Sequence, residues 1–283
     1  QPSGRKMEIG AFQIPAFERD RFVYPVGTNL QMPSFSTEGS YIVRAELAGE
    51  LSVIAEEKLL VVEPAGKGPL PRKVGIVSST PTLSKPFELL PGLVVEPFQP
   101  GGTYDVLIAA NRFARPPETQ ADPNTEIQGT DDDELYRSIS YGDPNTIEFV
   151  FAGLPKGTAK VTLKFAEVFQ NAEGLRMFDV ALNGEVVLTD FDVFKAAGGK
   201  NIALDRTFMT AAPDGVVHIT FPKVPKPSAR ICAIKIEVGD SVLAINCGGK
   251  AYKDKSGLVW KQYAPPTQLS DAVIKRVWDG LPL

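Results

Sequence analysis

The chain has 283 residues, of which 43% are hydrophobic and 23% charged, a globular composition with material for about one to three domains. Its formal net charge of -4 argues against nucleic acid or an anionic membrane as partner, because both need clustered Lys and Arg. No apolar run reaches the roughly 18 residues of a membrane span, and 24 prolines with 25 glycines favour short strands and tight turns.

The first 65 residues are predicted to form an antiparallel β piece. Apolar and polar side chains alternate in SYIVRAELAG (40–49), and SVIAEEKLLVVEP (52–64) ends in a second strand. The next stretch, PAGKGPLPR (64–72), has the composition of a linker.

After the linker the pattern changes to nearly continuous apolar strands, the type that a parallel sheet buries on both faces. Three such strands are KVGIVSST (73–80), LVVEPF (93–98) and TYDVLIAAN (103–111), with a short stretch of helical character between the first two. Near the other end, SDAVIKRVWDG (270–280) has apolar residues at a spacing of three and four. That spacing predicts a helix packed on a sheet, so the two regions together indicate part of an α/β domain.

Between these regions, from about Arg115 to Asn246, alternating strands return. They include NTIEFVFAGL, GTAKVTLKFAEVF, RMFDVALNGEVVL and GVVHITFPKV, and turns such as Asn183-Gly184 suit β-hairpins. This spacing predicts an antiparallel β-sandwich interrupting the α/β domain.

Three stretches of the sandwich carry a more specific signal: DELYRSISYGD (133–143), residues 161–201 and ARICAIKIE (229–237). The middle stretch contains Phe-Ala-Glu, Phe-Asp-Val-x-x-Asn-Gly and Asp-Phe-Asp-x-Phe elements. Together they resemble the malectin family of carbohydrate-binding β-sandwiches. In that family a strand similar to INCGG opens the domain, whereas here AINCGG (244–249) follows the last predicted strand.

Three explanations of this late strand remain open. The sandwich is permuted or inserted, a second truncated copy begins there, or YDVLIAAN stands in for the missing strand. We favour permutation or insertion, because the helix at 270–280 leaves no room for a second sandwich.

The flanks are similar to accessory regions of glycoside hydrolase family 2, the β-galactosidase-like enzymes. GAFQIPAF, YIVRAELAGE and LLVVEP within 1–65 resemble an immunoglobulin-like domain. KVGIVSS and YDVLIAAN in 72–114, with the helix in 258–283, resemble a flavodoxin-like module. The expected fold is therefore mainly β: an immunoglobulin-like sandwich piece, a partial flavodoxin-like α/β segment, and a malectin-like (galactose-binding-like) antiparallel sandwich at 115–257.

These resemblances imply a non-catalytic, carbohydrate-binding region of a bacterial glycoside hydrolase. The implied partners are an oligo- or polysaccharide and the catalytic domain of a parent glycosidase, and the implied location is periplasmic or extracellular. The alternative function is a structural module that packs against the catalytic domain or mediates assembly without binding sugar.

The family's sugar site is an aromatic-lined cleft at the loop end of the sandwich, where ring faces pack on the C–H face of a pyranose. By correspondence, Tyr141 in LYRSISY is expected to line the cleft, as are Phe169 and Gln170 after Phe-Ala-Glu, where an amide replaces one ring. Asp192 is expected to contact a sugar hydroxyl, with an exposed loop face as the alternative. The family's late aspartate falls at about Pro227.

No catalytic residue, cofactor or metal ligand is predicted. His218 is the single histidine, so a His-based metal site or a Ser-His-Asp site lacks its partners. The acidic run TDDDE (130–134) lacks the spacing of a calcium loop. Glu167 is expected to satisfy backbone or cross-strand partners, and Cys232 and Cys247 to be buried thiols, with a single disulfide as the alternative.

Overall fold

The structure is a computed structural model, and it describes residues 39–46, 53–61, 71–77, 83–109, 116, 118–144, 146–267, 269 and 271–281. The chain divides into two compact units, 1–64 and 65–283. In the first unit β1 (Gly39–Glu46) and β2 (Val53–Val61) form an antiparallel pair, as predicted. The immunoglobulin-like character of 1–65 stays a prediction, since residues 1–38 lie outside the described part.

The second unit begins with a small sheet in the order β4-β5-β3-β6. Its central strand β3 (Lys73–Val77) is parallel to both β5 (Leu93–Pro97) and β6 (Val106–Ala109). Helix α4 (Asp271–Asp279) contributes Ile274, Val277 and Trp278 to the apolar cluster on this sheet. The three predicted parallel strands and the predicted helix are therefore present.

The prediction of a helical stretch between the first two parallel strands is wrong. Those residues form β4 (Phe87–Leu90), which pairs antiparallel with β5. Pro91 and Gly92 make the connecting turn, in which Gly92 has a φ of 80° and its N–H donates to Glu88 Oε1 at 2.6 Å. A Pro-Gly pair with positive φ at the glycine is the signature of a type II turn, so the hairpin was encoded locally.

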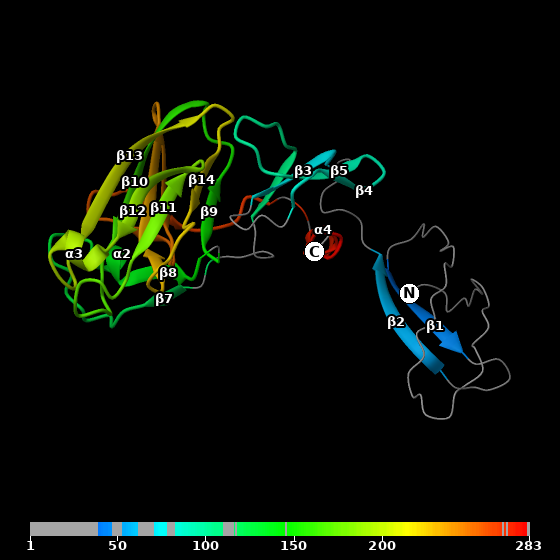
Figure 1. Cartoon of the computed structure of the whole chain (residues 1–283), viewed down its shortest axis with the longest axis horizontal. Helices are drawn as coiled ribbons and strands as arrows, with labels where there is room; N and C mark the ends of the chain where they lie inside the picture. The colour runs from blue at the N-terminus through cyan, green and yellow to red at the C-terminus, as the bar shows by residue number, and fades with distance from the viewer. Residues whose placement is uncertain are drawn as a thin grey trace. The chain divides into compact units, whose positions relative to one another are not determined.

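The rest of the unit is a β-sandwich of two larger sheets with a smaller third sheet (Figure 1). The larger sheets have the orders β13-β10-β16-β17-β19-β18 and β12-β11-β14-β9, and the third is β15-β8-β7. The short helices α2 (Asp133–Arg137) and α3 (Val193–Ala197) lie with β7 and β8 towards one end of the sandwich (Figure 1). The strands are β7 (Glu118–Gln120), β8 (Ser138–Gly142), β9 (Glu148–Phe151), β10 (Gly157–Phe165), β11 (Phe178–Leu182), β12 (Glu185–Phe191), β13 (Leu204–Ala212), β14 (Val217–Thr220), β15 (Ala229–Ile231), β16 (Ala233–Val238), β17 (Ser241–Asn246), β18 (Tyr252–Lys253) and β19 (Val259–Gln262).

The core lies between the two larger sheets, and β10 shows how the sequence creates it. Its alternate residues Ala159, Val161, Leu163 and Phe165 are fully buried and pack against residues of the facing sheet. The Phe165 ring meets the ring of Phe191 at 5.2 Å between centroids, nearly edge to face. Alternation along a strand sends one set of side chains inward, so the predicted sandwich follows from the pattern alone.

The late AINCGG strand belongs to this sandwich. Its first three residues form the second half of β17 (Ser241–Asn246), which pairs antiparallel with β16 along its whole length and parallel with β19. The late strand therefore completes this sandwich, and its being permuted or inserted stays a prediction. The proposal that YDVLIAAN stands in for this strand is wrong, because β6 joins the α/β sheet instead. Strand β19, within the 258–283 stretch that we grouped with the α/β segment, also lies in the sandwich sheet.

The Cys-Gly-Gly turn after β17 packs directly on β8. The Ser140 hydroxyl donates to the Cys247 carbonyl at 2.5 Å. A Cβ on Gly248 would lie 2.1 to 2.2 Å from the backbone of Ile139, so only glycine allows this approach. The turn therefore supports β8 one residue before its exposed Tyr141.

Both cysteines are buried free thiols, as predicted, and they form no disulfide. Burial raises the pKa of Cys232 to about 12 and that of Cys247 well above its ordinary value. The two residues are adjacent in the fold, since the Cys247 N–H donates to the Cys232 carbonyl at 3.0 Å. They act as small apolar side chains of the core.

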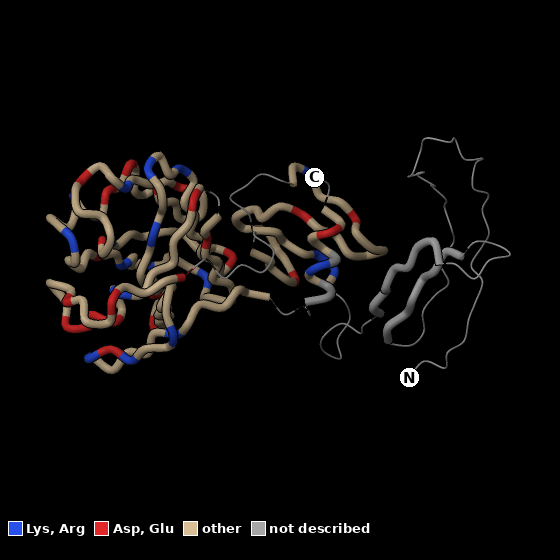
Figure 2. The backbone as a smooth tube through the Cα atoms, turned by 90° about the horizontal axis from the view of Figure 1, so that it is seen from below, with Lys and Arg blue, Asp and Glu red and all other residues tan. Residues whose placement is uncertain are grey.

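Acidic and basic residues are interspersed over the described part of the second unit, and neither sign gathers on one side (Figure 2). Among the described residues, no helix combines the length and apolar character that crossing a bilayer demands.

Candidate functional site

Two exposed aromatic residues adjoin one buried arginine at the candidate site. Tyr141 of β8 is 39% exposed, and Phe169, just after β10, is 47% exposed. Tyr141 is paired with Arg230 across β8 and β15, which places the two side chains on the same face. The Phe169 ring lies over the Arg230 guanidinium, with Cζ 5.3 Å from the ring centroid. The structure therefore brings these two predicted site residues to the same arginine.

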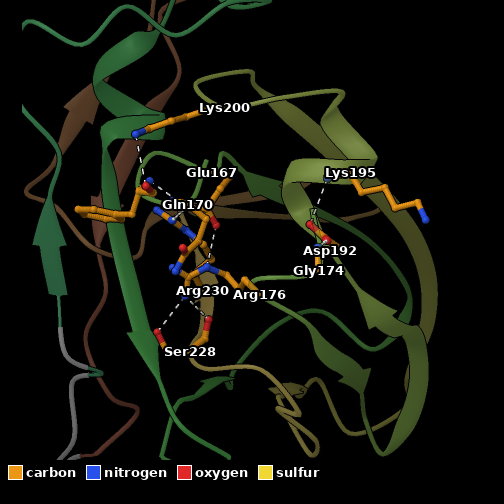
Figure 3. A network of polar contacts seen from close by, with 10 residues as sticks. Glu167, Gln170, Gly174, Arg176, Asp192, Lys195, Lys200, Ser228 and Arg230 are labelled. Carbon is orange, nitrogen blue, oxygen red and sulfur yellow. Dashed lines mark hydrogen bonds and ion pairs between the residues drawn. The ribbon is translucent and has the colours of Figure 1, made fainter. Parts of the chain in front are cut away.

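Arg230 belongs to a buried network centred on Glu167 (Figure 3). Glu167 Oε1 accepts from Arg230 Nη1 at 2.6 Å, and Oε2 accepts from Arg176 Nε at 2.7 Å. The same Oε1 accepts the backbone N–H groups of Phe169 at 2.9 Å and Gln170 at 3.0 Å. The prediction that Glu167 satisfies backbone partners is confirmed, and the carboxylate also fixes the start of the Phe169 loop.

The network extends to the segment before β15. Arg176 Nη1 donates to the Ser228 carbonyl at 2.5 Å and to its hydroxyl at 3.0 Å. Arg176 thus ties the strand that carries Arg230 to the loop that follows Phe169. Charge-assisted hydrogen bonds of this kind are short and directional, so they hold the site in one geometry.

The electrostatics of the network follow from its burial. Burial by itself would raise the pKa of Glu167, but Arg230, the backbone N–H groups and Arg176 together hold that pKa below its ordinary value. Burial lowers the pKa of Arg230, against the attraction of Glu167. The carboxylate is therefore ionised at neutral pH.

A shallow depression of about 450 Å³ lies beside the Phe169 loop. Lys200 connects the two, because its Nζ donates to the Phe169 carbonyl at 3.3 Å and to Asn171 Oδ1 at 2.9 Å. Gln170, the residue before the lining residue Asn171, is half-buried. The residues lining the depression are Asn171, Ala172, Glu173, Phe194, Lys195 and Gly198.

Asp192 is the N-cap of helix α3 (Figure 3). Its Oδ1 accepts the Lys195 N–H at 3.1 Å, and its Oδ2 accepts the Gly174 N–H at 2.5 Å. The carboxylate therefore joins the two segments that form the walls of the depression. A sugar contact by Asp192 stays a prediction.

A second depression, of about 410 Å³, lies over the TDDDE run and contains Asp131, Asp133 and Lys255. Its acidic side chains have internal partners: Asp133 Oδ2 accepts from Arg137 at 2.9 Å and from the Ile127 N–H at 3.2 Å. Within the described ranges, no three His, Cys, Asp or Glu side chains gather in a way that could hold a metal ion.

The β-sandwich region can be compared with known domains. Residues 101–239 match the malectin domain. The match ends just after β16, so the strands from β17 onward lie outside it. A malectin-like domain therefore occupies the middle of the chain. Malectin domains bind carbohydrate rather than catalyse reactions.

Several solved structures are similar to the chain at low identity. The ANXUR2 extracellular domain from Arabidopsis thaliana is 14% identical with a TM-score of 0.39, covering 45% of this chain and 41% of that one. The plant receptor-like kinase FER is 17% identical with a TM-score of 0.39, covering 50% and 47%. The Bacteroides uniformis beta-glucuronidase is 19% identical with a TM-score of 0.38, covering 72% and 23%. The chain thus spans less than half the length of each, and a search of curated proteins found no match.

Two arginines of the malectin-like domain, which hold the candidate site together, were not among the predicted site residues. Arg230 lies in the almost apolar strand ARICAI, and a lone cation inside such a run indicates a buried, paired charge. Arg176 lies between Leu175 and Met177 and has no comparable signal. Its partners are 9 and 52 residues away, at Glu167 and Ser228, and only folding brings them together.

Proposed function

We propose that the malectin-like domain binds carbohydrate on the face formed by Tyr141 and Phe169. The observation that carries the proposal is that two exposed aromatic residues adjoin Arg230, Tyr141 by strand pairing and Phe169 by its ring over the guanidinium. A pyranose packs its C–H face on such rings, while amide and charged groups bond its hydroxyls. Gln170 and the neighbouring depression supply that polar surface.

The expected affinity is modest. The depression is shallow and the two rings are half covered by the protein, so a bound sugar keeps much of its surface in water. We expect dissociation constants between about 1 mM and about 1 μM, which correspond to favourable binding free energies of roughly 4 to 8 kcal/mol.

A glycan array of the purified chain, followed by titration calorimetry of the best glycan, tests this function. Tyr141→Ala and Phe169→Ala should each weaken binding by about tenfold or more, since each removes a stacking ring. Met209→Ala is the matched control, because Met209 is 62% exposed on β13, outside the candidate site. No binding to any galactan, glucan or host glycan would overturn the proposal, as would an equal loss of affinity in all three variants.

We further infer that the chain is a non-catalytic accessory region of a bacterial, β-galactosidase-like glycoside hydrolase that works in the periplasm or outside the cell. The support is the resemblance of the flanks, whose α/β part contains the parallel strands β3, β5 and β6. The purified chain should hydrolyse no aryl glycoside. Measurable turnover would contradict this assignment.

A structural module is the second candidate, and one observation favours it. Residues of the α/β sheet and the sandwich share an apolar cluster that includes Leu107, Ala109 and Val216. The Phe98 ring also meets the buried His218 ring edge to face at 5.9 Å. If this is the function, neither the unmodified chain nor Val216→Asp binds any glycan. Val216→Asp should instead separate the α/β sheet from the sandwich, which would be measured as faster proteolysis between them.

A further inference from the structure

The buried network at the site carries an unbalanced positive charge. Arg176 and Arg230 supply two positive charges and Glu167 supplies one negative charge, which leaves one positive charge among almost fully buried side chains. Lys200 adds a further cation at the edge of the Phe169 loop. Buried charges are normally matched, so the site lacks an anion.

Arg230 also holds two donors without a partner in the described part of the chain. Its Nη1 donates to Glu167, but Nε and Nη2 are buried and have no hydrogen bond. These two nitrogens share one edge of the planar guanidinium group. That edge presents two parallel N–H groups, the arrangement that binds both oxygens of a carboxylate. A buried donor pair left unbonded in this way is unfavourable unless a ligand completes it.

One side of this arginine is covered by a ring that is itself half exposed. Phe169 lies over the guanidinium, yet almost half of its surface is exposed. The residues from Asn171 to Leu175 that follow it are exposed as well. A rotation of the Phe169 ring therefore requires no repacking of the core, and the displaced ring remains beside the opening to stack on a sugar.

From this geometry we infer that the ligand is an acidic glycan, whose sugar carboxylate binds the Nε and Nη2 edge of Arg230 when the Phe169 ring turns aside. This inference rests on the proposed carbohydrate-binding function and specifies its substrate class as uronic-acid-containing oligosaccharides. The carboxylate would neutralise the excess charge of the network and bond both free donors. Tyr141, on the same face as Arg230, would then contact the ring of the acidic sugar or of its neighbour.

Matched ligands test the inference on the unmodified chain. Calorimetry would compare an oligogalacturonate, its methyl ester and the neutral oligogalactose of the same length, with sialyllactose as a second source of sugar carboxylate. We expect the acid to bind about tenfold or more tightly than its ester, because the ester loses the charge and one acceptor. In parallel, the Arg230 Nε–H signal in a nitrogen-proton correlation spectrum should shift with the acid and not with the ester. Arg230→Lys serves to assign that signal.

The outcomes separate this inference from the general function. Equal binding of acid, ester and neutral sugar overturns the acidic-glycan inference and leaves carbohydrate binding intact, whereas no binding of any sugar overturns both. Preference for sialyllactose over the galacturonate overturns the uronate class. Preference for the galacturonate with an unmoved Arg230 signal overturns the role of Arg230, and a loss of that preference in Lys200→Gln would assign the carboxylate to Lys200 instead. Because the ligand comparison needs no variant, it holds even if Arg230→Lys fails to fold.

Discussion

The Glu167 carboxylate lies 2.6 Å from Nη1 of Arg230, and neither side chain is exposed to solvent. This ion pair joins β15, the strand paired with the Tyr141 strand β8, to the loop that carries Phe169, because Glu167 also accepts the Phe169 N–H. Stability and the shape of the candidate site therefore depend on the same carboxylate.

Replacing that carboxylate should be costly. Glu167→Gln keeps the shape but leaves two buried guanidinium groups without their counter-charge. We expect a loss of about 3 to 5 kcal/mol in the free energy of unfolding, measured by urea denaturation. Lys160→Gln, which breaks a half-exposed pair with Glu237, is the control and should change it by less than about 1 kcal/mol. A similar loss for both substitutions would show that the buried ion pairs stabilise the fold no more than the half-exposed pair does.

The same pair predicts how stability changes with pH. The pKa of Glu167 is lower in the folded chain than its ordinary value, so its contribution is complete above the unfolded pKa and is lost as the pH falls through the folded one. The free energy of unfolding should therefore decline below about pH 4.3. In Glu167→Gln this decline should be shallower. Parallel curves for the two proteins between about pH 7 and about pH 3 would contradict the assigned pKa shift.

Asp192 has a structural role that a pair of variants can separate from sugar binding. Asp192→Ala removes the cap of α3 and the bond to Gly174, so we expect a loss of about 0.5 to 2 kcal/mol of stability. Asp192→Asn keeps one acceptor oxygen for the Lys195 N–H but presents an NH2 donor to the Gly174 N–H, so it should restore only part of that loss. If the Asn variant is stable but binds glycan much less well, the Asp192 carboxylate contacts the ligand as first expected.

Gly248 should tolerate no side chain. In Gly248→Ala the new Cβ meets the Ile139 backbone at 2.1 to 2.2 Å, so β8 and the turn must separate. Overpacking of this kind costs about 1 to 3 kcal/mol. Gly239→Ala is the control, since its Cβ would meet nothing within 4 Å and only its positive φ opposes the change. Equal thermal shifts for the two variants would mean that the close approach is not rigid.

The buried thiols should be unreactive in the folded chain. The raised pKa values of Cys232 and Cys247 keep both protonated, and burial hides them from reagent. We expect no reaction with Ellman's reagent at about pH 8 until denaturant is added, after which both thiols react. Prompt labelling of the native protein would show that the core around them opens readily.

The sequence predicts those parts of the fold that depend on local patterns. Alternation gave the strands of the sandwich, as in β10, and continuous apolar runs gave the parallel strands β3, β5 and β6. Two local signals were overlooked: the Pro91-Gly92 turn that makes β4 and β5 a hairpin, and the Asp192 cap that begins α3. Both are short-range and were encoded in turn and cap residues.

Only part of the candidate site could be predicted from the sequence, because its other part depends on contacts between residues far apart in the chain. The resemblance pointed to Tyr141 and Phe169; Tyr141 is paired with Arg230 across two strands and the Phe169 ring lies over the guanidinium of Arg230, while their role in binding stays a prediction. The arginine between them was not found, because its partner Glu167 is 63 residues away and the role of a charge depends on what surrounds it in the fold. Pairings at that distance follow from topology rather than from composition.

The position of β17 has a practical consequence for dividing the chain into pieces. A fragment that stops at residue 239, where the malectin match ends, would leave β16 as a bare edge with an apolar strand exposed. Such an edge invites pairing with other copies, so we expect the fragment to aggregate. A peptide spanning residues 241–262 carries β17 to β19, together with the turn that supports β8. Added during refolding, it should complement the fragment as a donated strand, and the two pieces would then assemble as a split protein.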